Sequence, residues 1–185
     1  MKSMIARCGV LSAAALTLAS AAGAQDKNTF ESGPVFEDFG PHAPVDGIEH
    51  FAPETEFAHS FDVARAAEKG GRSRGIESAA RFINMHVANG VAQENIRVAV
   101  VVHGPAVFDL LSAEGWAAHE REGENDSAAM VQAMLTEGVR FIVCGQSAAG
   151  QGIGVDQLIE GVEMDLSAMT AHARLQQAGY TVNPF

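Results

Sequence analysis

Short runs of apolar residues alternate along the chain with segments in which apolar residues recur every three or four positions. Residues 95–102 and 139–143 form two such runs, and their β-branched side chains are typical of strands buried on both faces of a parallel sheet. Residues 76–87 instead place their apolar side chains on one face of a helix, which Asn89 and Gly90 close. The same patterns predict further strands at 56–63, 162–166 and 180–182, and further helices at 106–111, 127–136, 155–159 and 167–178.

Strands that alternate with helices indicate consecutive βαβ units. We therefore predict an α/β domain, a three-layer sandwich in which a mostly parallel central sheet of about five strands is flanked by helices. The polar segment 112–126 is interpreted as a loop, a lid or a short surface helix. Residues 145–154 contain four glycines and are interpreted as a flexible loop or a broken helix.

The first 24 residues have the features of a secretory signal peptide. Lys2 and Arg7 give a positive start, residues 9–19 form a short apolar stretch, and Ala22 to Ala24 form a cleavage site of small residues. The apolar stretch is too short to span a bilayer comfortably. We therefore expect a periplasmic protein that has no membrane span after the signal is removed.

Residues 25–56 are predicted to form an irregular arm before the α/β domain of residues 57–185. Their four prolines break helices and central strands, yet the same segment holds four of the ten phenylalanines. A purely disordered tail seldom carries so many aromatic residues. We expect the arm to lie over the domain or over a neighbouring subunit; a floppy linker with a few apolar residues is the alternative.

Composition and motifs exclude several classes of function. The net charge of −11 argues against nucleic acid and anionic membranes as partners. The sequence contains no HExxH, CxxC, GxSxG or P-loop pattern, so neither a metal site nor a cofactor is predicted. The basic loop 65–75 could attract an anion, although a solvated loop is the simpler interpretation. His86 and His172 lie beside apolar helix faces and are interpreted as packing residues.

Cys144 is the residue around which a functional site is predicted. Cys8 lies within the signal peptide, so the exported protein keeps a single cysteine and forms no internal disulfide. Cys144 ends a core strand and stands beside a possible helix N-terminus, where ligands bind in α/β sheets and where a thiolate is favoured. The alternative is a small, buried and unreactive side chain.

His103 follows the other strand that the sequence predicts to be central. If the two strands are neighbours, the imidazole lies near the thiol and can stabilise its thiolate, so Cys144 and His103 are the candidate catalytic residues. Gly104, Gln146 and Ser147 are the candidate substrate-binding residues, because they flank the same strand ends. A hydrogen bond from His103 to a backbone carbonyl is the alternative role of this histidine.

Three stretches resemble the DsrE/DsrF-like sulfur-relay family, in its exported single-domain branch: residues 75–86, 96–105 and 138–147. The resemblance covers about residues 57–183 and implies a parallel sheet between helices, in subunits that form homo-oligomers, trimers or hexamers. Relay members of the family carry sulfur as a persulfide on one cysteine, and Cys144 matches that position. The absence of a second cysteine fits a carrier better than a dithiol oxidoreductase.

The leading hypothesis is therefore a periplasmic sulfur-handling protein, a sulfurtransferase or sulfur carrier, in which Cys144 accepts sulfur and passes it on. The sulfur donor and acceptor are not identified by the sequence. Two alternatives stay open: a non-catalytic oligomeric module that binds a small ligand at the sheet edge, and a thiol redox sensor. A buried thiol with an unshifted pKa would favour the binding module.

Overall fold

The structure, a computed structural model, describes residues 29–183 of the chain. The predicted signal peptide, residues 1–24, lies outside the described residues. One sheet has the strand order β4-β3-β2-β1-β5, and every neighbouring pair is parallel, so the predicted α/β fold is confirmed. The strands are β1 (Phe57–Val63), β2 (Ile96–Val102), β3 (Arg140–Cys144), β4 (Glu163–Asp165) and β5 (Thr181–Asn183).

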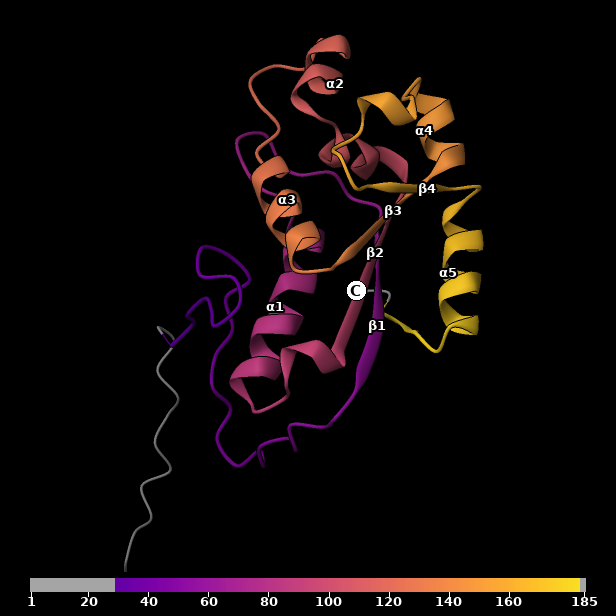
Figure 1. The fold of residues 1–185 in the computed structure, drawn as a ribbon. Coiled ribbons are helices and arrows are strands. Elements are labelled where there is room, and N and C mark those ends of the chain that lie inside the picture. Colours follow the sequence, from indigo (N-terminus) through magenta and orange to yellow (C-terminus); the bar gives the residue numbers. More distant parts are fainter. Residues whose placement is uncertain (1–28, 184–185) are drawn as a thin grey trace, which may run out of the picture.

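Helices cover both faces of this sheet (Figure 1). The helices α1 (Arg74–Ala88) and α3 (Ala128–Thr136) lie on one face, and α5 (Ala168–Gln177) lies on the other. Among the described residues, no helix is both long and apolar enough to cross a membrane. The shorter helices are α2 (Ala113–Ala118) and α4 (Gly145–Gln151), with 3-10 turns η1 (Gln93–Asn95), η2 (Gly104–Leu110) and η3 (Val155–Gln157).

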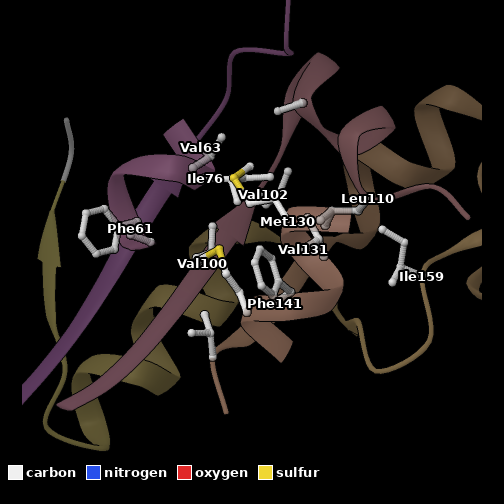
Figure 2. Close-up of a cluster of buried hydrophobic side chains, with 14 of the residues drawn as sticks. Phe61, Val63, Ile76, Val100, Val102, Leu110, Met130, Val131, Phe141 and Ile159 are labelled. Atoms are coloured by element: carbon white, nitrogen blue, oxygen red, sulfur yellow. The ribbon is translucent and has the colours of Figure 1, made fainter. Parts of the chain in front are cut away.

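The larger hydrophobic core fills the space between the sheet and the helices α1 and α3. Figure 2 shows Val100 of β2 and Phe141 of β3 in this cluster together with Ile76 of α1, and all three side chains are fully buried. On the opposite face, Val101 packs against Leu175 of α5 in a smaller cluster. Because β2 and β3 bury side chains on both faces, they are the central strands that their apolar runs predicted.

The arm packs on α1 of the same chain through its backbone. The fully buried side chain of Asn84 accepts the N–H groups of Val35 and Phe36 at 3.1 and 2.9 Å. Its amide group donates to the carbonyls of Phe36, Phe39 and Gly40 at 3.0 to 3.1 Å. The rings of Phe36 and Phe39 are themselves part of the larger core. The division into an arm and a domain at residues 56 and 57 stays a prediction.

Two segments for which the sequence left both a loop and a helix open contain helices. Residues 145–154 include α4, whose end is set by Gly152 in the left-handed conformation with φ 71°. Of the two interpretations of this segment, the broken helix is confirmed and the flexible loop is not, because a short helix follows β3 directly. Residues 112–126 contain α2, which begins where the Ser112 hydroxyl accepts the N–H of Gly115 at 3.0 Å.

The register of the sheet brings the candidate residues to one edge. Val63 of β1, Val102 of β2 and Val143 of β3 are paired in register. His103 and Cys144 are the residues that follow on β2 and β3, so they stand side by side where the two central strands end. The helices that follow these strands begin at the same edge.

Candidate functional site

Cys144 is both the last residue of β3 and the N-cap residue of α4. Its side chain lies on the face that α5 covers, because Ile142, two positions earlier, packs in the cluster beneath that helix. The residue is 5% exposed, so only a small part of it reaches solvent. The β3–α4 junction thus holds the thiol at the sheet edge, in a largely enclosed position.

Hydrogen-bond donors surround the thiol of Cys144. Burial raises the pKa of this thiol, but it is outweighed by the hydroxyl of Ser147 and by the backbone N–H groups of Ser147, Ala168 and Gln146. The pKa of Cys144 therefore lies below the usual value of a cysteine thiol, and the thiolate is favoured. The thiol is therefore buried, as expected for an unreactive cysteine, but its pKa is lowered, as expected for a reactive one.

The backbone donors come from the beginnings of two helices. Gln146 and Ser147 lie in the first turn of α4, and Ala168 is the first residue of α5. The N–H groups in the first turn of a helix have no partner inside that helix, so they are free to bind another acceptor. Here they converge on one sulfur atom from both sides of the β3 end.

The candidate substrate-binding residues gather around Cys144. The Ser147 hydroxyl oxygen accepts the N–H of Gly104 at 2.9 Å, which joins the loop after β2 to the thiol. Gly104 has a φ of 56°, a left-handed conformation that favours glycine. The side chain of Gln146 donates to the carbonyl of Leu166 at 3.4 Å and so ties α4 to the connection between β4 and α5.

His103 directly follows β2, the strand beside that of Cys144, but its ring is bonded toward β1 on the other side. Its Nε2 atom lies 3.0 Å from Oδ2 of Asp62 on β1. Among the described residues, His103 is not one of the groups that shift the pKa of the Cys144 thiol. Cys144 and His103 therefore lie at the same edge of the sheet, but the hydrogen-bond partner of the imidazole is the carboxylate of Asp62.

Asp62 binds a second histidine across the layers of the fold. Nε2 of His172 on α5 lies 2.8 Å from Oδ1 of Asp62, and its Nδ1 lies 3.3 Å from Oγ of Ser60. Burial raises the pKa of Asp62, but hydrogen bonds and charge interactions with His103 and His172 lower it below the usual range. In residues 29–183, no three side chains of the metal-binding types are arranged to hold a metal ion.

Sequence reasoning missed three parts of this site. Asp62 lies near the carboxyl end of the predicted first strand, and a charged residue at that end was a signal for a functional position. His172 was interpreted as a packing residue, whereas it bonds the carboxylate of Asp62. Ala168 contributes only a backbone N–H, and no side-chain pattern in a sequence reveals such a donor.

The fold and the site define a parallel α/β protein with a thiol of lowered pKa at the carboxyl edge of its sheet. Residues 61–184 match the model of the DsrE/DsrF-like family, and the chain belongs to that family. Membership implies a protein of the sulfur-relay type. A search of curated proteins found no match.

Two solved structures are similar to this chain. One is a protein of unknown function, MTH1491, from Methanobacterium thermoautotrophicum, with 22% identity and a TM-score of 0.48. The other is the ychN protein from E. coli, with 20% identity and a TM-score of 0.49. Each match covers 70% of this chain and 100% of the other chain.

Proposed function

We propose that this protein is a sulfur carrier in which the thiolate of Cys144 accepts a sulfur atom and passes it on as a persulfide. The observation that supports this most directly is the lowered pKa of the Cys144 thiol, which three backbone N–H groups and one hydroxyl produce. The thiolate is the nucleophile in sulfur exchange. A structural cysteine buried among apolar groups has no need of such donors.

The proposed step conserves atoms and electrons. The Cys144 thiolate attacks the outer sulfur of a donor persulfide, a new S–S bond forms, the S–S bond of the donor breaks, and the donor leaves as a thiolate. In the second half of the cycle an acceptor thiolate attacks the outer sulfur on Cys144 and restores the Cys144 thiolate. The donors around Sγ are placed to stabilise the negative charge at the start and end of this cycle.

His103 has the role of exchanging a proton with the reacting sulfur species. Its Nε2 atom is engaged by Asp62, and its side chain is 31% exposed. The carboxylate fixes the ring orientation, which leaves Nδ1 as the atom that can take or give a proton. His172 supports this arrangement by holding the other oxygen of Asp62, so we assign it a positioning role.

We further propose that the protein works outside the cytoplasm as a homo-oligomer. The export proposal depends on the features of residues 1–24, and the oligomer proposal, a trimer or hexamer, depends on the family. Fractionation of the host cells and the intact mass of the exported protein test the first proposal. Sedimentation analysis of the purified protein tests the second.

Inorganic polysulfide is the probe that tests the carrier function, because it is a small sulfur donor that needs no dedicated binding pocket. We expect the protein to gain one sulfur atom on Cys144 in an intact-mass measurement, and to lose it to added dithiothreitol. A Cys144→Ser variant is expected to gain none. A wild-type protein that stays unmodified contradicts the proposal, and a gain of oxygen under mild peroxide alone would instead support a redox sensor.

One observation favours a second function. Cys144 is only 5% exposed, which fits a module that binds a small ligand at the sheet edge without a covalent step. In that case the thiol would resist alkylating reagents in the native protein and react with them after denaturation. Rapid native alkylation would exclude this alternative.

A further inference from the structure

The segment that follows β1 lines a pocket that contains two unpaired arginine side chains. The pocket has a volume of about 690 Å³, within the range of roughly 300–1,000 Å³ that small-molecule sites occupy. The charged and polar residues that line it are Asp62, Arg65, Glu68, Arg72, Arg74 and Ser78. From the sequence, this basic loop could attract an anion, although a solvated loop was the simpler interpretation.

The guanidinium groups of this pocket stand out in a chain with a net charge of −11. Within residues 29–183, Arg65 and Arg74 have no ion-pair or hydrogen-bond partner for their side chains. Arg72 is held by the carbonyl of Asp38 at 3.3 Å and lies 3.9 Å from Glu77. Arginine binds carboxylates through a planar fork of donors, so an unpaired pair of arginines in a pocket favours an anionic ligand.

The same pocket also contains a carboxylate that has no partner. Glu68 makes no side-chain ion pair within the described part of the chain, whereas Asp62 is occupied by two histidines. A simple oxyanion would be repelled by Glu68. A ligand that carries two carboxylates and one ammonium group matches both signs of charge, which is the pattern of a short peptide that contains one acidic residue.

The pocket lies next to the site around Cys144, because Asp62, which bonds His103, is one of its lining residues. Ala64, which lines the pocket, is the residue after Val63 and so stands level with His103 and Cys144 across three adjacent strands. Two strand spacings of about 4.8 Å separate β1 from β3, or roughly 10 Å. An extended peptide spans about 3.3–3.6 Å per residue, so a tripeptide has the length to reach from the pocket to the thiol.

The enclosure of the thiol also favours a small donor. At 5% exposure, Cys144 is more easily reached by the slender end of a small molecule than by a cysteine on the surface of a folded partner. We therefore propose that the sulfur donor is the persulfide of a short peptide thiol, anchored by its carboxylates at Arg65 and Arg74. This inference rests on the proposed carrier function and names the donor class.

Sulfur transfer from the peptide persulfide is the same thiolate exchange that we propose for the carrier. The Cys144 thiolate attacks the outer sulfur of the peptide persulfide, which leaves as the peptide thiolate and takes a proton from His103, the residue to which we assign proton exchange. No oxidant or reductant is consumed. The arginines make no contact with the reacting sulfur in this scheme and act only by holding the carboxylates of the donor.

Glutathione and its persulfide are suitable probes, since glutathione has two carboxylates, one ammonium group and one thiol. We expect calorimetry to show binding of reduced glutathione by the wild-type protein, and binding about tenfold weaker in an Arg65→Ala/Arg74→Ala variant. A control variant, Arg81→Ala/Arg97→Ala, removes the same charge from side chains that do not line the pocket and should bind as the wild type does. No binding by the wild type, or equal weakening in both variants, overturns the inference.

Sulfur transfer separates this inference from the carrier function. We expect the Arg65→Ala/Arg74→Ala variant to be loaded about tenfold more slowly by low concentrations of glutathione persulfide and at the wild-type rate by inorganic polysulfide. Equal loading of both proteins by both donors would overturn the peptide donor and leave the carrier intact. Failure of both donors on the wild type would remove the carrier function, and the donor class proposed here would fall with it.

Discussion

Nε2 of His103 lies 3.0 Å from Oδ2 of Asp62, so the imidazole at the end of β2 is bonded toward β1 and not toward the thiol on β3. From the sequence, His103 was expected to stabilise the Cys144 thiolate. Stabilisation of the thiolate belongs to Ser147 and to the backbone N–H groups at the starts of α4 and α5. Proton exchange is the role that we propose for His103.

Replacement of His103 by glutamine tests whether this residue exchanges protons without stabilising the thiolate. The amide of glutamine can still donate a hydrogen bond to Asp62, but it does not titrate near neutral pH. We expect the pH profile of Cys144 alkylation to stay unchanged and the rate of sulfur loading to fall about tenfold or more. An alkylation profile that moves to higher pH would show that His103 stabilises the thiolate directly.

The hydroxyl of Ser147 is the side-chain donor to the Cys144 thiol, and its oxygen accepts the N–H of Gly104. We expect Ser147→Ala to raise the pKa of the thiol, because burial then opposes fewer hydrogen bonds. Native alkylation at pH 7 should slow by about threefold to tenfold. A Thr136→Val variant, which removes a hydroxyl bonded within its own helix, should react as the wild type does.

The positions of Cys144 and His103 at the edge of the sheet were within reach of sequence reasoning. Two apolar, β-branched runs predicted the central strands, and parallel strands end at a common edge. The hydrogen-bond partner of His103 could not be predicted from the sequence, because the orientation of its ring decides whether it bonds Cys144 or Asp62. His172 shows the same limit, since a histidine on an amphipathic helix looks the same in sequence whether or not it bonds a carboxylate on a neighbouring strand.

Some elements of the fold can be predicted from the local pattern of apolar residues, and others cannot. Residues 76–87 predicted the centre of α1, because apolar residues at helical spacing match the face it buries. The four glycines of residues 145–154 left both a flexible loop and a broken helix open, and the structure has the helix α4 there, ending at Gly152. A bond such as that of Asn84 to the backbone 48 residues away leaves no local signal at all.

Asn84 provides a test of how the arm is held. Its side chain is fully buried and accepts or donates five hydrogen bonds with the arm backbone. We expect Asn84→Ala to lower the free energy of unfolding by about 2–4 kcal/mol, because buried backbone groups lose their partners. Chemical denaturation measures the loss, and proteolysis should cut residues 29–56 faster than in the wild type.

Asn95 is the matched control for this prediction. It too bonds the arm backbone, through its amide donating to the carbonyl of Pro53 at 2.9 Å, but that bond is exposed to solvent. We expect Asn95→Ala to cost less than about 1 kcal/mol, because water can replace the amide. Equal losses for both variants would mean that burial of Asn84 is not what stabilises the arm.

Asp109 has a carboxylate whose ionisation opposes folding. It is 3% exposed, and its Oδ2 accepts the N–H of Ala67 at 3.0 Å from the segment that follows β1. Burial raises its pKa to about 6, although hydrogen bonds from Ala67 and Ser73 and the charge of Arg121 act in the opposite direction. The folded protein therefore holds a proton that the unfolded chain releases at lower pH.

The sign of the pH effect follows from this difference. A folded pKa of about 6 lies above the unfolded value of 3.8, so the stabilising contribution is complete below about pH 3.8 and is lost as the pH rises through 6. Asp109→Asn cannot titrate. We expect the free energy of unfolding of this variant, relative to wild type, to rise by up to about 3 kcal/mol between pH 4 and pH 7. Urea denaturation of both proteins across this pH range measures the difference between their free energies of unfolding. The contributions of the other titrating groups cancel in this difference, because both proteins share them. A difference that stays constant with pH would show that Asp109 ionises normally, and one that falls would show that the folded protein prefers its charged form.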